Sequence, residues 1–315
     1  MSKLVIFGAT GQQGHSILTT ILAHPTLSKR YSLRGITRDA SKPTPQSLSA
    51  QGVEMLEANL NDPTTLPPAV KDAHTVILIT ETQYVPDLKE REIAQAKAVA
   101  DAALAAGVQF FVFSSAVHCA KLWDGPAVDQ FDSKAEIEEY VRGLPFAIGS
   151  AFVAPGMFMQ NLTGVMAPRQ GEDGSWVIAG VNDPEAQIPM FDAVGDSGAY
   201  LVPVLEDVGG SKGRVVYAAS GMYSFAEIAR IIGRVSGEDV KYVQLPYDVY
   251  QGFMHEDQGA RMVAMMRFFD NPGYYGPGTG EKVAETRELV KASGGKLASF
   301  EEFADKFFQT LEIDL

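Results

Sequence analysis

The chain has 315 residues, of which 46% are hydrophobic and 21% charged, and it carries a net charge of −13. Such a chain can bury a sizeable core, as one large α/β unit or as a larger domain with a smaller lobe. Its acidic balance disfavours direct binding to nucleic acid or to an anionic membrane surface. With a single cysteine, no signal peptide and no apolar run long enough to cross a bilayer, we expect a soluble intracellular protein.

The opening of the chain predicts a strand, a glycine loop and a helix. Residues 3–7 form a short apolar, β-branched run, which is typical of a strand buried on both faces. Three glycines follow within residues 8–14, and from Gln13 onward apolar residues recur at helical spacing. A helix that starts at a glycine loop directs its backbone N–H groups and its positive end toward phosphate groups.

The same alternation continues to about residue 154. We predict strands at 31–37, 52–56, 75–80, 109–115 and 146–153, and helices at 62–71, 88–106 and 131–141. Strands that alternate with helices in this way indicate βαβ units and a parallel sheet. The sequence therefore predicts a doubly wound α/β fold of the Rossmann type.

The pattern loosens after Pro155. We expect short strands at 176–179 and 214–218, and helices at 224–235, 259–269 and 300–311. These elements suggest two units, a Rossmann domain at 1–154 and a smaller, mostly helical lobe at 155–315 that can return one or more strands to the sheet. Open α/β sheets bind ligands at the carboxyl ends of their strands, so we expect the lobe to lie there and to form a cleft.

The glycine loop predicts a dinucleotide site. One glycine permits a tight turn, one lets the pyrophosphate approach the backbone, and one lets helix and strand pack closely. From this loop and the predicted strand ends, the expected cofactor contacts are Gly8, Thr10, Gly11, Gln12, Gln13, Gly14, Thr37, Arg38, Lys42, Asn59, Leu60, Thr80 and Ser114.

The end of the second predicted strand favours NADP(H) over NAD(H). An arginine at this place binds a ribose 2′-phosphate, whereas a carboxylate binds the free 2′-hydroxyl. Arg38 holds the position, and Lys42 can add a second positive charge. Asp39, the neighbour of Arg38, could partly serve an NAD ribose, so this alternative stays open.

Several motifs carry a family resemblance. They are Gly8-x-x-Gly11-x-x-Gly14, Thr37-Arg38, Phe113-Ser114-Ser115, Phe131-Asp132-Ser133-Lys134 and the segment from Pro155 to Asn161, which reads Pro-Gly-Met-Phe-Met-Gln-Asn. With these motifs the chain resembles the NmrA-like family of atypical short-chain dehydrogenases/reductases over nearly its whole length. The resemblance implies an NADP(H)-binding Rossmann domain and an interdomain cleft, with Lys134, Pro155 and Phe158 near the nicotinamide. A cytoplasmic protein is expected, or one that also enters the nucleus if it is regulatory.

The catalytic pair of the typical short-chain dehydrogenase is incomplete. That pair is Tyr-x-x-x-Lys, in which the lysine helps the tyrosine to exchange a proton with a carbonyl group. Here the tyrosine position holds Gln130, whose amide cannot do so, while Lys134 remains. By the resemblance, Lys134 either binds the ribose hydroxyls or is itself the general acid.

Two further residues are candidates for the proton donor. Tyr84 follows the predicted strand at 75–80, and His118 follows the predicted strand at 109–115. Loops at these strand ends lie over the sheet, where functional residues are common. His118 could equally be a local hydrogen-bond partner. No spacing of cysteine, histidine and carboxylate residues suggests a metal site.

Two functions remain open on this reading. The first, narrowly favoured, is an NADPH-dependent atypical reductase of a small apolar or aromatic molecule. The second is a non-catalytic NADP(H) sensor, whose occupancy changes the affinity of the second lobe for a regulatory protein partner. The loss of the tyrosine favours the sensor, and the expected ordinary cleft without an interaction tail favours the reductase.

Overall fold

Seven parallel strands form the central sheet of the computed structural model, which describes residues 1–171 and 173–311. In spatial order the strands are β11 (Val215–Ala218), β6 (Gly149–Pro155), β5 (Phe110–Ser114), β4 (Ala73–Leu78), β1 (Ser2–Phe7), β2 (Tyr31–Thr37) and β3 (Glu54–Glu57). The predicted doubly wound Rossmann fold is confirmed. The chain order reverses between β1 and β4, and ligands bind at such a reversal in open α/β sheets.

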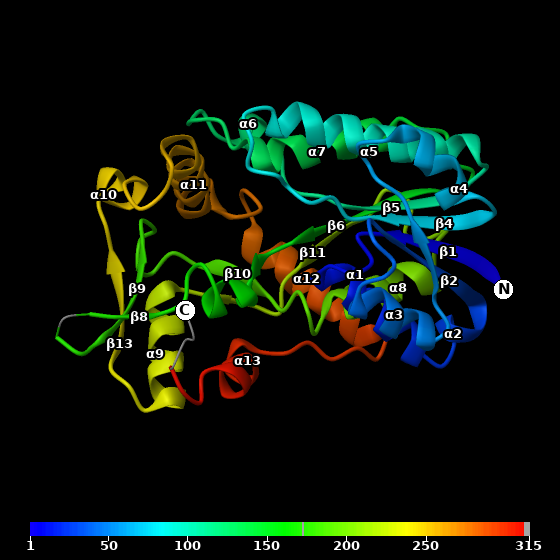
Figure 1. The fold of residues 1–315 in the computed structure, drawn as a ribbon. Coiled ribbons are helices and arrows are strands. Elements are labelled where there is room, and N and C mark those ends of the chain that lie inside the picture. Colours follow the sequence, from blue (N-terminus) through cyan, green and yellow to red (C-terminus); the bar gives the residue numbers. More distant parts are fainter. Residues whose placement is uncertain (172, 312–315) are drawn as a thin grey trace.

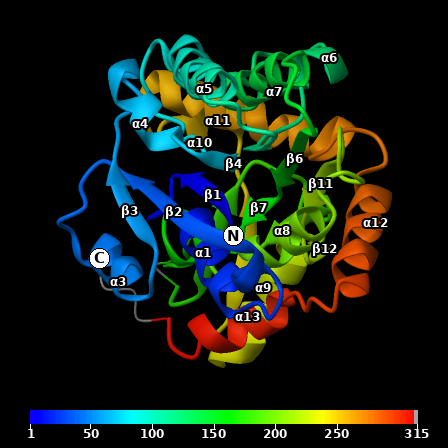
Figure 2. The ribbon, with the colours of Figure 1, turned by 90° about the vertical axis from the view of Figure 1, so that its right-hand side faces the viewer.

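Helices cover both faces of this sheet (Figures 1 and 2). One face carries α4 (Leu66–Val70), α5 (Leu88–Ala105) and α7 (Asp129–Arg142), and the other carries α1 (Gln12–Ala23) and α8 (Ser197–Glu206). Further short elements of the N-terminal half are α2 (Leu27–Arg30), α3 (Pro43–Ala50), η1 (Pro63–Thr65) and α6 (Cys119–Leu122).

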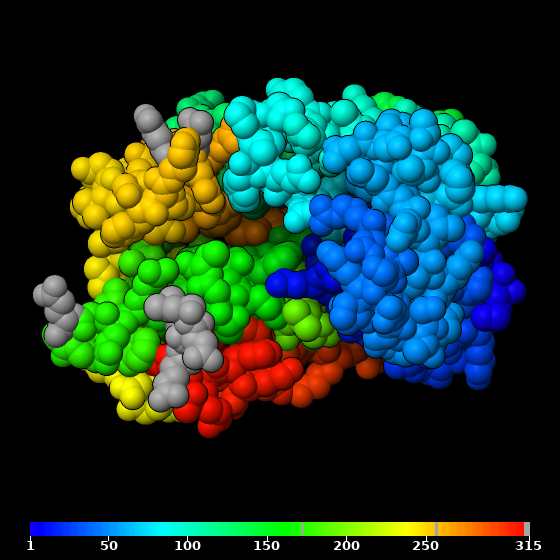
Figure 3. Space-filling model, in the orientation of Figure 1, coloured from blue at the N-terminus to red at the C-terminus, as the bar shows by residue number. Residues whose placement is uncertain are grey.

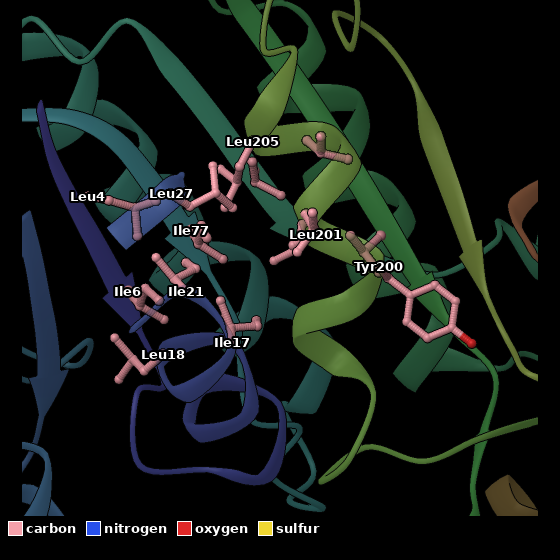
Figure 4. Packing of buried hydrophobic residues seen from close by; sticks show 14 of the residues in the cluster. Leu4, Ile6, Ile17, Leu18, Ile21, Leu27, Ile77, Tyr200, Leu201 and Leu205 are labelled. Atoms are coloured by element: carbon pink, nitrogen blue, oxygen red, sulfur yellow. The ribbon is translucent and has the colours of Figure 1, made fainter. Parts of the chain in front are cut away.

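Strand β1 shows why residues 4–7 are apolar without interruption. Successive side chains of a strand point to opposite faces. Leu4 and Ile6 pack with the α1 and α8 side, as Figure 4 shows, whereas Val5 and Phe7 pack with the α5 and α7 side. Both faces of the strand are therefore buried, as the sequence predicted.

The second part of the chain combines helices with two small sheets. One sheet contains β12 (Gly221–Tyr223), β10 (Ile188–Phe191) and β7 (Met157–Phe158), and the other β13 (Val240–Gln244), β9 (Trp176–Gly180) and β8 (Arg169–Gln170). The helical elements are η2 (Met159–Thr163), α9 (Phe225–Ser236), α10 (Tyr247–Gln251), α11 (Glu256–Phe268), η3 (Phe269–Gly273), α12 (Thr279–Ala292) and α13 (Phe300–Phe307). In Figure 1 most of this part lies beyond the carboxyl ends of the central strands.

Two elements after residue 155 belong to the central layers. Strand β11 pairs in parallel with β6 and forms one edge of the sheet, and α8 packs on α1. Helix α8 was not predicted, because Gly198 and Pro203 within it are poor helix formers in isolation. Its burial against α1 outweighs that local preference. The predicted helix at 62–71 is shorter, a 3-10 turn followed by α4.

None of the helices within residues 1–171 and 173–311 is long and apolar enough to cross a membrane.

Candidate functional site

The glycine loop between β1 and α1 has the geometry expected of a phosphate site. Gly8 has φ of +78°, and a Cβ on it would lie 2.9 Å from the carbonyl oxygen of Ile79. A Cβ on Gly14 would lie 2.1 Å from the carbonyl oxygen of Gly8, so only glycine permits this approach of helix to strand. The cap position is Gly11, and the first turn of α1 has neither an acidic residue nor a capping side chain. Its N–H groups are thus placed to bind an anion.

The end of β2 presents Arg38 to solvent. Its side chain is 74% exposed, and its guanidinium lies 3.6 Å from the carboxylate of Glu81, which is similarly exposed. Asp39 is engaged locally, since its carboxylate accepts hydrogen bonds from the Ser41 hydroxyl at 2.5 Å and the Ser41 amide at 2.9 Å. These bonds lower the pKa of Asp39. Lys42, the residue before α3, is exposed as well.

Lys134 on α7 is held by a buried carboxylate that the sequence reasoning missed. Its ammonium forms an ion pair with Glu92 on α5 and donates to the hydroxyl of Thr80 at 3.0 Å. Thr80 and Ser133 in turn donate to Glu92 at 2.6 and 2.7 Å. Burial alone would raise the pKa of Glu92, but Lys134 and the two hydroxyl donors outweigh it and keep this pKa below its ordinary value.

This cluster lies at the same sheet edge as the glycine loop. Thr80 follows Ile79, the residue that a Cβ on Gly8 would meet. Ser114, at the end of β5, donates a hydrogen bond of 3.1 Å to Gln13 in the first turn of α1. The carboxyl ends of β1, β4 and β5 therefore bring the loop, Ser114 and Lys134 together. Figure 3 shows the surface hollowed between the N-terminal half, in blue and cyan, and the second part, in green and gold.

Tyr84 lies in the loop after β4 and is 46% exposed. Desolvation and the negative charge of Glu92 raise the pKa of its phenol, although Arg261 opposes them. A raised pKa makes Tyr84 a weaker proton donor at neutral pH. Arg261, on α11, donates to the carbonyl oxygen of Val85 at 3.2 Å and so ties the second part of the chain to this loop.

Gln130, at the position of the usual tyrosine, is 4% exposed. Its Nε2 donates to the carbonyl oxygen of Arg261 at 3.4 Å, and its buried Oε1 has no hydrogen-bond partner within the described residues. The amide is packed beneath α11. This arrangement agrees with the sequence argument that Gln130 performs no proton transfer.

His118 lies in a different environment from Lys134. Its Nδ1 is 3.0 Å from Oδ1 of Asp132, which also accepts the amide of Ala120 at 3.2 Å. His118 lines a hollow of about 330 Å³ between α7, β6 and β11, together with Lys121, Tyr217 and Lys282 among others. The Lys134 cluster is not part of that lining.

The remaining predicted residues lie at strand ends. Pro155 ends β6, and Phe158, half-buried, packs on Phe191 with ring centroids 5.4 Å apart. Asn59, exposed after β3, accepts a hydrogen bond from the amide of Asn61 at 3.0 Å, and Leu60 is half-buried. Thr10 and Gln12 are exposed in the glycine loop, and Thr37 ends β2. Within residues 1–171 and 173–311, no group of three or more potential ligands could hold a metal ion.

Comparison with known proteins gives one family. The NmrA-like family model matches residues 1–304. An NmrA-like family domain-containing oxidoreductase of Aspergillus flavus is 25% identical over 311 residues, covering 93% of this chain and 91% of its own.

Two solved structures share the fold over almost their whole length. NmrA, a negative transcriptional regulator, in complex with NADP has a TM-score of 0.80 and 22% identity, covering 98% of this chain and 95% of its own. Triphenylmethane reductase of Citrobacter sp. in complex with NADP(H) has a TM-score of 0.76 and 19% identity, covering 96% and 99%.

Proposed function

This chain belongs to the NmrA-like family, and we propose that it is an atypical NADPH-dependent reductase of a small apolar or aromatic molecule. The observation that carries this proposal is the placement of Lys134. Its ammonium is anchored at the carboxyl end of β4, beside the glycine loop, by Glu92 and Thr80. A charged group held in this way at a ligand-binding sheet edge suits a polar reaction next to a cofactor.

NADP(H) is the cofactor that these residues fit. The uncapped first turn of α1 suits the pyrophosphate, and Arg38 suits the 2′-phosphate because its guanidinium is exposed and Asp39 is engaged by Ser41. Family membership and the NADP and NADP(H) complexes of the two structural neighbours support the same choice.

Bound NADPH would supply a hydride, and the reduction of a carbonyl compound, an enone or an imine would also need a proton. Lys134 is the best-placed donor, directly or through a water molecule at its ammonium. Tyr84 is a weaker acid through its raised pKa, and His118 is paired with Asp132 beside a separate hollow. The second part of the chain, most of which lies beyond the carboxyl ends of the central strands, would exclude bulk water from the substrate, which strengthens the effect of a nearby charge.

A second function has specific support. With Gln130 in place of the tyrosine, the chain could bind NADP(H) without turnover and act as a redox sensor for a protein partner, as a cytoplasmic or nuclear regulator. NmrA itself is described as a negative transcriptional regulator and was crystallised with NADP. Arg261 offers a physical connection, since it joins α11 to the loop after β4, beside Tyr84.

NADPH oxidation separates the two functions. We expect turnover with at least one member of a panel of carbonyl compounds, enones, imines and quinones, which take up a proton together with the hydride, and its loss in Lys134→Ala. Lys89→Ala, which removes a partly exposed lysine on α5, is the control and should retain activity. The reductase proposal fails if NADPH binds, no compound is reduced, and cofactor occupancy instead changes the capture of a protein partner.

A further inference from the structure

We propose that Glu92 is a positioning residue: it holds the ammonium of Lys134 fixed at the cofactor edge of the sheet. This inference rests on the proposed function, because it assigns Lys134 a role next to the cofactor. It concerns a residue on α5 that no sequence motif indicated.

The first observation that supports this proposal is the burial of the Glu92 carboxylate. Its side chain is only 2% exposed. A buried charge is costly unless it is paired and its remaining lone pairs are satisfied. Glu92 meets both conditions through four side chains from two other segments, namely Thr80, Thr82, Ser133 and Lys134.

The second support is the directional fixing of the ammonium. A lysine ammonium has three N–H donors. Within the described residues, the hydrogen bonds of Lys134 go to Glu92 and to Thr80, and Thr80 itself donates to the same Oε1 of Glu92 at 2.6 Å. This triangle fixes the ammonium at two points and leaves one donor for a cofactor hydroxyl or a substrate.

A neighbouring ion pair shows what a merely structural link between these helices looks like. Lys89 and Glu136 also join α5 to α7, with 2.6 Å between Nζ and Oε1, but their side chains are 28% and 37% exposed. Holding the two helices together therefore does not require a buried carboxylate. Replacing a buried ion pair by apolar residues is often neutral or stabilising, so stability alone is a poor reason for Glu92.

The test compares Glu92→Gln with Glu136→Gln, which removes the partly exposed pair between the same helices. Glu92→Gln keeps the shape of the side chain but removes its charge and replaces one acceptor oxygen with an amide donor. We expect Glu92→Gln and Lys134→Met each to lower kcat about tenfold or more, while the double variant loses no more than the worse single variant. Glu136→Gln should stay within about twofold of the parent chain.

Rescue by a charge-conserving variant distinguishes positioning from a purely structural effect. Glu92→Asp keeps the carboxylate, so it should restore kcat at least in part, whereas a loss of packing alone would be larger in the shorter side chain. A lower kcat in Glu92→Asp than in Glu92→Gln would overturn the proposal.

If no substrate is found, measurements of NADPH affinity test the same proposal. Glu92→Gln and Lys134→Met should then weaken NADPH binding similarly and without additivity, whereas Glu136→Gln should not weaken it. If Glu92→Gln does not fold, as thermal unfolding would show, the comparison uses Glu92→Asp. Unchanged NADPH affinity in the Glu92 variant beside a weakened Lys134→Met would overturn the assignment. If NADPH binding changes as expected but no compound is reduced, the reductase function fails and the proposal about Glu92 stands.

Discussion

Gln130 donates its side-chain amide to the backbone carbonyl oxygen of Arg261, 3.4 Å away, and so joins α7 to α11. Arg261 also reaches the carbonyl oxygen of Val85 at 3.2 Å, and its Nε lies 3.9 Å from Asp129. The position that carries the proton-transferring tyrosine in a typical short-chain dehydrogenase is thus part of a junction between the two parts of this chain. A larger side chain at this position would therefore press against α11.

Gln130→Tyr should therefore not create a conventional alcohol dehydrogenase. The larger ring has to enter a site that is 4% exposed, and overpacking of this kind costs about 1–3 kcal/mol. Urea unfolding should show the loss of stability, and NADP-dependent oxidation of simple alcohols should stay at background. Gln130→Met, which keeps the volume and removes the unpartnered Oε1, is the control and should be much closer to the parent chain in stability. Efficient alcohol oxidation by Gln130→Tyr would contradict this account.

Cofactor preference should depend on Arg38. Hydrogen bonds to charged groups contribute about 1.5–3 kcal/mol, so Arg38→Ala should weaken NADPH binding by roughly 10- to 100-fold. NADH lacks the 2′-phosphate and should lose little. Titration of both cofactors by fluorescence measures the difference, and equal losses would overturn the assignment of NADP(H).

Glu81 provides the complementary test. Its carboxylate lies 3.6 Å from the Arg38 guanidinium and would repel a nearby phosphate. Glu81→Gln should therefore bind NADPH somewhat more tightly, most visibly at low salt. Weaker NADPH binding in this variant would instead indicate that Glu81 orients Arg38.

The glycine loop should respond differently at two of its glycines. A Cβ on Gly14 would lie 2.1 Å from the carbonyl oxygen of Gly8, whereas a Cβ on Gly11 would lie 3.4 Å from the same atom. Without cofactor, Gly14→Ala should lower the free energy of unfolding by about 2 kcal/mol or more, and Gly11→Ala by much less. Chemical denaturation of the two variants measures this contrast, and equal stability losses would argue against the described helix–strand contact.

The strands and the glycine loop could be predicted because local patterns encode them. Continuous apolar runs such as 4–7 reflect burial on both faces, and Gly8 and Gly14 reflect backbone positions that only glycine takes without strain or steric overlap. Glu92 could not be found in this way. It lies among the charged residues at the start of α5, a pattern that is typical of a solvent-exposed helix face. Only the packing of α7 against α5 buries it.

The environment of His118 could also be predicted only in part. Its position after β5 correctly indicated a loop at the carboxyl end of the sheet. The sequence could not show that Asp132, fourteen residues later, binds its ring and that it faces a hollow separate from Lys134. The distance in sequence between such partners is bridged only by the tertiary fold.

The contribution of Asp196, which precedes α8, to stability should fall with rising pH. Its carboxylate accepts the amide of Ala298 at 2.9 Å and interacts with the charges of Asp192, Glu302 and Lys296. Burial, with added repulsion from Asp192 and Glu302, raises the pKa of Asp196 from 3.8 to about 7. Between these values Asp196 binds more protons in the folded chain than in the unfolded chain, so its contribution to the free energy of unfolding decreases as pH rises, in total by about 4 kcal/mol.

Asp196→Asn isolates this contribution, because an amide stays neutral and can still accept the hydrogen bond of Ala298. We expect the stability of the variant relative to the parent chain to increase between pH 4 and pH 7, and the variant to be the more stable of the two at pH 8. Chemical denaturation at several pH values measures both effects. Asp305→Asn, which changes an exposed acid on α13, should keep the parent slope. If Asp196→Asn is destabilising by the same amount at pH 5 and pH 8, the carboxyl is ionised throughout this range and its burial does not make stability depend on pH.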